Sequence, residues 1–406
     1  MHQQLRLHRW CQWISRAHPD GVYDGEDAKH GDYAASLPPF LLREVLLPHL
    51  QQGGKAVILV EEWQTVPAVL HLDWLLRQAK VRSQVAILWN ANNTFAFDRI
   101  DWARLAEAAM ITTVSRYMKH LMHGLGVNAL VIPNGRSPDD LVPPTPAAVR
   151  AFRCRVPGRT VLNKVARWDP EKGWLQTIET VSAMQRLGWR PLLLARGGIE
   201  AHGADVLATA AARGLRVVER VLPSPGVPGV LRLLESVGDV DVVNLRSALN
   251  PDSRRVLLRA SDAVLANSRH EPFGLVGLET MAVGGIACTG CSGEDYAVPG
   301  RNALVLETTD PREFLDLFGE LRANPVLERA IRRAGRVTAQ HYRWPEIVAR
   351  ILMPRLRFLA TRASSDHGST PEPREPLESI GVDAASRKKW KGLYGIRDPP
   401  RAAMQC

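Results

Sequence analysis

The sequence has no long apolar segment and few cysteines. No stretch approaches the 18 consecutive apolar residues that a membrane-spanning helix needs, and the opening MHQQLRLHRWCQW lacks the apolar run and cleavage site of a secretory signal. The five cysteines are odd in number and scattered through 406 residues, which excludes a disulfide-stapled scaffold. We therefore expect a soluble protein of the cytoplasm.

Metal-binding patterns are also missing from the sequence. Cys288 and Cys291 have the spacing of a metal-binding pair, but neither a second pair nor a nearby histidine pair accompanies them. Nor does a DxD-like motif stand near residues 164–174 or 270–279. The sequence thus predicts no metal site and no cofactor.

The chain carries a formal charge of +10, and this charge is unevenly placed. Residues 1–150 hold 15 Lys and Arg against 14 Asp and Glu, so about nine of the ten net positive charges lie further along. That location favours a phosphate-bearing ligand of the second half, although solvated faces of an arginine-rich chain would give the same total. We predict no nucleic-acid partner, and leave peripheral membrane contact and the oligomeric state open.

Short apolar runs alternate with helix-length amphipathic stretches, which is the pattern of parallel α/β sheets. We predict strands in the first half over residues 56–60, 84–89, 110–114 and 128–132. A second set is predicted over residues 161–166, 191–195, 215–218, 241–245, 262–266 and 285–288. Helices are predicted over residues 66–79, 101–108, 115–125, 325–340 and 345–361.

The turn-rich segment 133–144 divides these two sets of strands. We predict a Rossmann-like domain over 1–145, a doubly wound Rossmann-like domain over 150–344, a closing helix over 345–362 that could cross back, and a disordered tail over 363–406. Residues 1–20 offer only a Trp- and Arg-rich helical stretch where an apolar strand and a glycine-bearing turn should stand. The first domain is therefore expected to lack its first strand and loop.

The strongest motif is HEPFGLVGLE at 270–279, where two carboxylates stand eight positions apart after a predicted strand. Gly274 lets the backbone turn into a helix whose free N–H groups face the carboxyl edge of the sheet, and a phosphate is expected there. Glu271 would lie in the loop beside this helix end. Glu279, a little more than one turn into the helix, could accept hydrogen bonds from the hydroxyls of a ribose.

The second motif is KVARWDPEKGW at 164–174, a predicted strand that ends in a turn carrying Arg167 and Lys172. Two cations at one edge can neutralise a diphosphate, arginine through its planar fork and lysine as a mobile point charge. A pyrophosphate leaving group without a metal needs such help. Taken alone, an arginine and a lysine on a turn also fit solvated surface.

Four blocks, in order along residues 56–310, resemble one family. VSRYMKHLM resembles its helix start, IPNGRSPDDL its interdomain segment, ARWDPEKGW its "GR…PEKG" turn, and SRHEPFGLVGLETMAVGG the "PS…E-x7-E" block of the retaining GT-B glycosyltransferases. The resemblance implies two Rossmann-like domains facing a cleft. It also implies metal-independent transfer of a sugar, with retention, from a nucleoside-diphosphate sugar to a hydroxyl acceptor in glycan or cell-envelope synthesis.

The resemblance further implies roles for residues of the second half. Arg167 and Lys172 would hold the donor diphosphate, while Glu271 would sit by the hydroxyls of the donor sugar. Glu294 falls where the family often has a helix-initiating acid, so we expect a structural role for it. The other donor-binding residues would be Glu279 at the ribose, the backbone N–H groups of Phe273, Gly274 and Leu275, and a loop at Asn244 that clasps the nucleobase.

The first half would supply the acceptor side, and it departs from the family pattern. Asn90 or Asn92 would face the sugar where the family has a histidine, and Asn267 replaces the proline before the motif serine. Glu62 and Trp63 follow a predicted strand and could line the cleft, the tryptophan stacking on a sugar and the glutamate accepting its hydroxyls. Equally, they could cap the next helix.

Two other functions remain open for this sequence. A sugar-nucleotide epimerase or hydrolase would share the phosphate cations and the ribose carboxylate, because a fold does not fix the reaction. A nucleotide-sugar-binding protein without catalysis is favoured by the absent opening loop and histidine, whereas a start-site error predicts that upstream extension restores activity. The base and sugar of the donor are not identified, nor is the acceptor, whether a glycan, lipid-linked or small-molecule hydroxyl.

Overall fold

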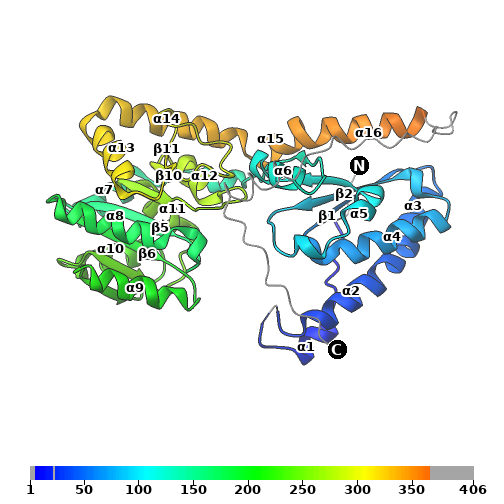
Figure 1. The fold of residues 1–406 in the computed structure, drawn as a ribbon, viewed down its shortest axis with the longest axis horizontal. Helices are drawn as coiled ribbons and strands as arrows, with labels where there is room; N and C mark the ends of the chain where they lie inside the picture. Colours follow the sequence, from blue (N-terminus) through cyan, green and yellow to red (C-terminus); the bar gives the residue numbers. More distant parts are fainter. Residues whose placement is uncertain (1–4, 22, 366–406) are drawn as a thin grey trace, which may run out of the picture. The chain divides into compact units, whose positions relative to one another are not determined.

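The computed structural model describes residues 5–21 and 23–365, and the predicted tail falls outside them from 366 on. The chain up to Thr361 forms one compact unit with two parallel sheets (Figure 1). This is the expected α/β class. Short 3-10 and π segments interrupt it at η1 (Leu41–Leu46), η2 (Trp63–Thr65), η3 (Arg82–Gln84), η4 (Phe97–Arg99), η5 (Pro138–Leu141), η6 (Pro170–Lys172) and η7 (Val348–Leu352).

The first sheet has the strand order β1-β2-β3-β4, all parallel. Its strands are β1 (Ala56–Glu61), β2 (Val85–Ala91), β3 (Met110–Thr113) and β4 (Leu130–Val131). Its helices are α1 (Gln12–Ala17), α2 (Glu26–Phe40), α3 (Leu47–Leu50), α4 (Val66–Gln78), α5 (Trp102–Ala108) and α6 (Arg116–His123). All four predicted strands are present. Helix α2 was not predicted, because Gly31, Pro38 and Pro39 lower its helix propensity, and packing on α4 overrides that preference.

Strand β1 lies at the edge of this sheet. It pairs with β2, and no other strand borders it among residues 5–21 and 23–365. The side chains of Val57 and Leu59 are 47% and 60% exposed, which is unusual for a parallel sheet. A pocket of about 490 Å³ lies beside the strand, lined also by α2 residues such as Tyr33 and Leu37. Within the described ranges this apolar edge is therefore bordered by no strand, and His8 and Trp10 line the pocket beside it.

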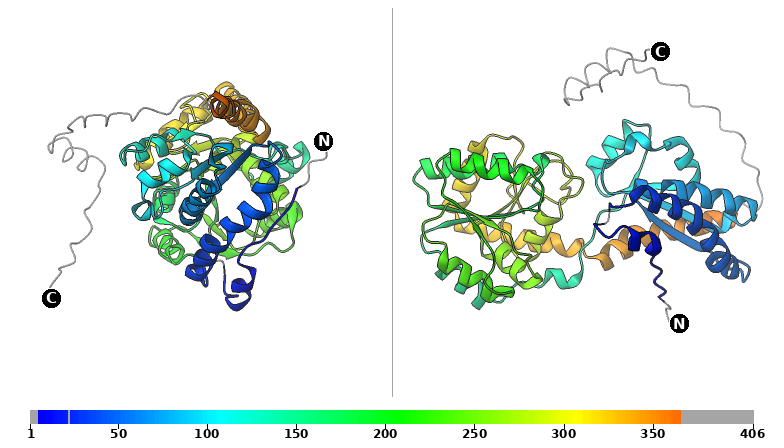
Figure 2. Two further views of the ribbon diagram at one scale, coloured as in Figure 1. Left: turned by 90° about the vertical axis from the view of Figure 1, so that its right-hand side faces the viewer. Right: turned by 90° about the horizontal axis from the view of Figure 1, so that it is seen from below.

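The second sheet has the strand order β11-β10-β9-β5-β6-β8-β7, again all parallel, with helices on both faces (Figures 1 and 2). Its strands are β5 (Thr160–Val165), β6 (Pro191–Arg196), β7 (Val217–Arg220), β8 (Val242–Leu245), β9 (Ala263–Ala266), β10 (Ala287–Thr289) and β11 (Leu304–Val305). From β5 the chain adds β6, β7 and β8 on one side of the sheet, and then β9, β10 and β11 on the other, so the strand order reverses between β5 and β9. Such a switch point opens a crevice at the carboxyl ends of the two strands, where ligands of doubly wound sheets bind.

Four helices of the second half begin in the same way, with an N-cap residue followed by proline at the first helical position. The side chains of Thr145, Asn250, Asp310 and Asn324 accept hydrogen bonds from backbone N–H groups two or three residues on. The helices of this half are α7 (Pro146–Cys154), α8 (Trp174–Arg186), α9 (His202–Ala212), α10 (Gly226–Ser236), α11 (Pro251–Ala260), α12 (Leu275–Ala282), α13 (Pro311–Ala323) and α14 (Pro325–His341).

The predicted closing helix is interrupted by a π segment, giving α15 (Trp344–Ile347) and α16 (Met353–Ser365) on either side of η7. Trp344 packs so closely on Gly135 that a Cβ there would lie 2.6 Å from the indole. The N–H of Arg136 donates to the carbonyl of Tyr342 at 2.7 Å. These contacts tie the segment after β4 to the start of α15.

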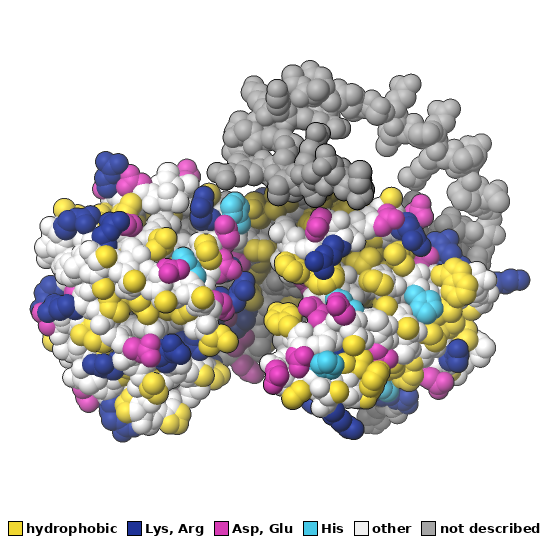
Figure 3. All heavy atoms as spheres, turned by 60° about the horizontal axis from the view of Figure 1, so that its bottom comes forward, with side chains coloured by type: hydrophobic (Ala, Val, Ile, Leu, Met, Phe, Trp, Pro, Cys, Tyr) yellow, Lys and Arg dark blue, Asp and Glu magenta, His cyan; other side chains and the backbone are white. Residues whose placement is uncertain are grey.

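Charged side chains of both signs are interspersed on the face drawn in Figure 3, and Lys and Arg do not gather there in one patch. That face resembles ordinary solvated surface rather than an extended basic surface. No helix in the described ranges is both long and apolar enough to cross a bilayer.

Candidate functional site

The two motifs of the second half meet at the β5/β9 switch point. The turn after β5 and the loop after β9 are joined by a hydrogen bond from the N–H of Arg269 to the carbonyl of Glu171, at 2.8 Å. Gly173, with φ of 64°, lies against the same loop, and a Cβ on it would stand 2.9 Å from the carbonyl oxygen of Asn267. The approach of the two segments, predicted from their places at strand ends, is present in the structure.

Lys172 and Glu271 form the centre of this crevice. The Lys172 ammonium donates to Glu271 Oε2 at 2.7 Å, and the hydroxyl of Ser268 donates to the same oxygen at 3.0 Å. Both charged side chains are 19% exposed, so the pair is only partly screened by solvent. The N–H of Glu271 donates to the hydroxyl of Ser292 at 2.9 Å. The arrangement holds a cation and an acceptor ready for a ligand at the sheet edge.

Arg167 points into solvent rather than toward this pair. Its side chain is 68% exposed, and its ion-pair partner is Asp169 at 3.6 Å. The carbonyl of Arg167 accepts a hydrogen bond from the indole N–H of Trp174 at 2.7 Å, which fixes the backbone of the turn. Of the two predicted cations, the structure brings Lys172 to the loop, and leaves Arg167 beside it on the same turn.

The start of α12 has the geometry of an anion site. Gly274 caps the helix with φ of 76°, and no side chain caps the first-turn N–H groups. Leu275 is the first residue of the helix and is 36% exposed. Phe273 is 3% exposed and packs edge-on against Tyr296, so its side chain anchors the loop while its backbone stays at the site.

A second carboxyl group lies under this loop. Glu294 is 5% exposed and its Oε1 has no hydrogen-bond partner, while a Cβ on Gly274 would stand 2.6 Å from Glu294 Cγ. Burial, and then the nearby Glu271 carboxylate, raise the pKa of Glu294 to about 8. At neutral pH its side chain is therefore protonated, which keeps the negative charge at the site down.

Glu279 lies one turn further along α12 and is held by two arginines. Arg136 Nη2 is 2.8 Å from Glu279 Oε1, and Arg254 pairs with Oε2. Glu279 is 5% exposed, and burial raises its pKa while the two guanidinium groups lower it. It lines a pocket of about 110 Å³ with Leu249 and Pro251. A ribose contact would have to share this carboxylate with the arginines.

The placement of Asn244 in a loop is wrong. Asn244 lies inside β8, is 2% exposed, and donates its side-chain amide to Glu219 at 3.0 Å. The strand extends through Leu245 because β6 and β7 pair with it on both sides. A nucleobase contact by the Asn244 side chain therefore stays a prediction that would require breaking this bond.

The predicted acceptor residues gather at the carboxyl ends of β1 and β2. The Glu62 carboxylate accepts from the N–H of Asn92 at 3.0 Å and from the side chain of Asn93 at 2.9 Å. Glu61 accepts from the side chains of Asn90, at 3.1 Å, and of Asn92. These carboxylates bind the asparagines. Glu62 stands at the N-cap position of η2, but its side chain makes no capping hydrogen bond there.

Glu62 also has a strained backbone, with φ of 73° and ψ of 158°. Its N–H donates to the carbonyl of Asn90, and its carbonyl accepts from the indole of Trp89. Half-burial raises the pKa of its carboxyl group. Trp63 is already flanked by other groups, since His30 packs edge-on at 4.9 Å and Arg99 lies 5.4 Å from the ring centre.

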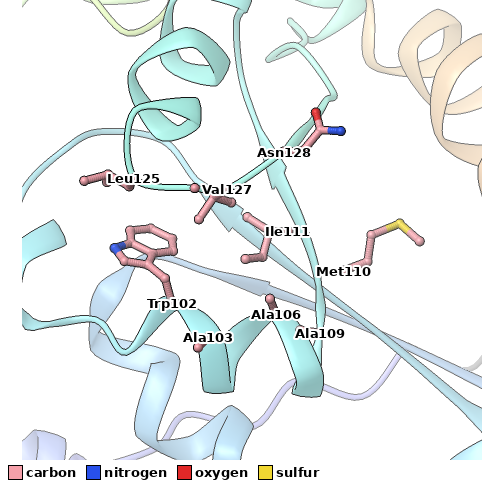
Figure 4. Close-up of a pocket in the computed structure, with 10 residues that line it drawn as sticks. Trp102, Ala103, Ala106, Ala109, Met110, Ile111, Leu125, Val127 and Asn128 are labelled. Atoms are coloured by element: carbon pink, nitrogen blue, oxygen red, sulfur yellow. The ribbon is translucent and has the colours of Figure 1, made fainter. Parts of the chain in front are cut away.

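A pocket of about 400 Å³ lies elsewhere in the first half (Figure 4). It is lined by Trp102 and Ala106 of α5, Met110 of β3, and Leu125 and Val127 after α6. Met110 begins β3, so this pocket is at the amino end of the strand, whereas Asn90 and Asn92 lie at a carboxyl end. Its polar side-chain groups are the indole N–H of Trp102 and the amide of Asn128.

Comparison with known proteins places the fold. No protein-family model matches the chain. The uncharacterized glycosyltransferase YqgM of Bacillus subtilis is 26% identical over 211 residues, 50% of this chain, and the chain spans only 52% of that relative's length. Sucrose-phosphate synthase from Thermosynechococcus elongatus has a TM-score of 0.56 at 17% identity, covering 82% of this chain and 79% of that one. Anabaena Alr3699/HepE in complex with UDP has a TM-score of 0.56 at 15% identity, covering 74% and 79%. The chain has the fold of the GT-B glycosyltransferases.

Proposed function

We propose that this protein is a retaining glycosyltransferase that moves a sugar from a nucleoside-diphosphate sugar to a hydroxyl of a glycan, lipid-linked or small-molecule acceptor. The observation that carries the proposal is the Lys172–Glu271 pair at the β5/β9 switch point, beside the uncapped start of α12. The similarity to YqgM supports the reaction class, and the UDP complex of HepE supports a nucleoside diphosphate as part of the donor. In this proposal residues 150–344 bind the donor and residues 1–145 bind the acceptor.

The donor would reorganise the charges of the crevice. Its diphosphate takes over the Lys172 ammonium, and Glu271 is then released to accept hydrogen bonds from the sugar hydroxyls. The first N–H groups of α12 face the charge that develops on the leaving phosphate, and the exposed Arg167 side chain would turn from solvent toward it. These groups supply the positive charge that departure of the nucleoside diphosphate requires, so the proposed reaction needs no metal.

Retention follows if the acceptor attacks from the face that the diphosphate leaves. The oxygen of the departing phosphate can then take the proton of the acceptor hydroxyl, and the protein needs no separate base or covalent nucleophile. Glu62 and the asparagines that it binds would hold the acceptor. We place this reaction in cytoplasmic glycan or cell-envelope synthesis.

A thermal-shift screen against UDP, GDP, ADP and TDP sugars tests the donor, because a true donor stabilises only the folded state. Turnover is then followed with and without acceptor alcohols. A new glycoside supports the proposal, while free sugar or an epimerised donor identifies the hydrolase or epimerase. Binding without turnover identifies a nucleotide-sugar-binding protein. If none of the donors shifts the unfolding temperature and none is consumed, the proposal is wrong.

A further inference from the structure

A lysine is buried beneath residues 267–274, the loop after β9 that we call the donor loop. Lys164 lies in β5 and is 1% exposed. Its ammonium donates to the carbonyl of Leu265 at 3.0 Å, the carbonyl of Asn267 at 3.1 Å and the side-chain Oδ1 of Asn267 at 3.0 Å. An ammonium has three donors, and all three are used. Every acceptor belongs to the end of β9 or to the first residue after it.

No carboxylate forms an ion pair with Lys164 in the described part of the chain. The positive charge is met by three oxygen dipoles and by the ring of Trp174, whose centre lies 5.5 Å from Nζ. Burial lowers the pKa of Lys164 to about 7, Cys288 and Glu271 oppose that shift, and Lys172 adds to it. A buried unpaired ammonium is costly compared with an apolar side chain, so its contacts require a reason beyond packing.

The contacts of Asn267 supply that reason. Its side-chain N–H donates to Gln176 at 2.9 Å, and its carbonyl oxygen faces Gly173. Asn267 is followed directly by Ser268, whose hydroxyl binds the Glu271 carboxylate that pairs with Lys172. Lys164 thus fixes the residue from which the donor loop departs.

We propose that Lys164 and Asn267 act together as a latch that positions the donor loop, so that Glu271 and Lys172 meet at the donor site. This inference rests on the proposed transferase function. It also explains why asparagine stands at 267, where the resembling family has proline. Proline would restrain the backbone but would offer no side-chain oxygen to the buried ammonium. Lys164 is a positioning residue, because it reaches the donor only through the loop.

The latch is tested with Lys164→Met and Asn267→Ala, with the exposed Lys80→Met as the matched control. Hydrogen exchange of residues 267–274 is expected to be about tenfold faster in both latch variants and unchanged in the control. With donor and acceptor, kcat is expected to fall about 10- to 100-fold, because a displaced loop misaligns the reacting groups. The Kd for the nucleoside diphosphate alone should change less than kcat.

The pH dependence separates positioning from mere stability. Because folding lowers the pKa of Lys164 from 10.5 to about 7, its charge opposes folding below pH 7, and this penalty fades as the pH rises toward 10.5. Above pH 7 the Lys164 ammonium loses its proton, so the kcat of the wild type should fall. Over the same range the contribution of Lys164 to the free energy of unfolding should rise. Asn267→Asp should move the loss of kcat to higher pH, because a carboxylate stabilises the ammonium.

The outcomes distinguish the two proposals. If the wild type transfers no sugar but the latch variants loosen the loop, the transferase proposal fails and the latch stands. If the wild type transfers sugar and the loop exchanges at the wild-type rate in both variants, the latch is overturned. The same holds if kcat follows thermal stability across the pH range.

Discussion

The guanidinium of Arg136 lies 2.8 Å from the carboxylate of Glu279, and Arg254 holds the other oxygen of that carboxylate. Arg136 comes from the turn-rich segment after β4, whereas Glu279 lies in α12. The contact therefore fastens this connecting segment to the helix that starts at the donor loop. It also means that the second glutamate of the motif is not open to a ligand without rearrangement.

Removal of Arg136 should destabilise the protein. Arg136→Met leaves the buried Glu279 with one guanidinium partner, and we expect the free energy of unfolding to fall by about 1–3 kcal/mol. Arg167→Met is the matched control, because its ion pair with Asp169 is exposed and should contribute little. Urea denaturation of the two variants measures the difference. An equal free energy of unfolding for Arg136→Met and the wild type would show that the Arg136–Glu279 ion pair does not stabilise the fold.

Loss of Lys172 should abolish most of the turnover while the fold persists. Lys172→Met removes a cation from the developing charge of the leaving diphosphate, and we expect kcat to fall about 10²- to 10³-fold. Arg167→Met should also lower kcat, but by less, since its side chain starts from solvent. Initial rates with the identified donor measure both effects, and circular dichroism checks the fold. If Lys172→Met and Arg167→Met both turned over at the wild-type rate, the assignment of the donor site to this crevice would be wrong.

Glu294 gives a prediction for stability against pH. Its folded pKa of about 8 lies above the ordinary value of 4.5, so the folded state retains a proton that the unfolded state has lost. The contribution is complete below about pH 4.5 and is lost as the pH rises to about 8. Glu294→Gln carries the neutral shape at every pH. The wild type should therefore lose stability relative to this variant between pH 5 and 8, as measured by thermal unfolding.

The strained backbone of Glu62 separates two effects at one position. Glu62→Ala removes the carboxylate but keeps a Cβ at φ of 73°, whereas Glu62→Gly also relieves the strain. We expect the glycine variant to be about 1 kcal/mol more stable than the alanine variant in urea denaturation. Both should raise the KM for the acceptor, because the asparagines lose their anchor. An unchanged KM would place the acceptor elsewhere.

Much of the second sheet could be predicted from sequence alone. Its strands are short and mostly apolar, and a glycine, Gly173 or Gly274, precedes the helix that follows β5 and the helix that follows β9, so the carboxyl ends that carry Lys172 and Glu271 could be placed at one edge. Strand β11 was missed because two residues carry no periodicity. The first sheet was predicted strand by strand, but α2 was not, since only its packing makes it helical.

Contacts between distant segments could not be predicted in the same way. Arg136 and Arg254 carry no pattern that points to Glu279, because the pairing depends on how η5 and α11 pack beside α12. The strand around Asn244 was predicted over 241–245, but the hydrogen bond of Asn244 to Glu219 depends on the pairing of that strand with β7. Lys164 stands in the motif 164–174, but nothing in the pattern indicates that its ammonium is buried and binds Asn267. The sequence pattern placed Lys172 and Glu271 at neighbouring strand ends, whereas their hydrogen-bond partners depend on packing.

The edge strand β1 favours association with other chains at a place away from the candidate site. Within residues 5–21 and 23–365 no strand pairs with the outer edge of β1, where the aliphatic side chains of Val57 and Leu59 are exposed, and another extended chain can add at such an edge. Concentrated preparations should therefore self-associate through this strand. A charged gatekeeper such as Leu59→Lys is the substitution to make before crystallisation or spectroscopy is attempted.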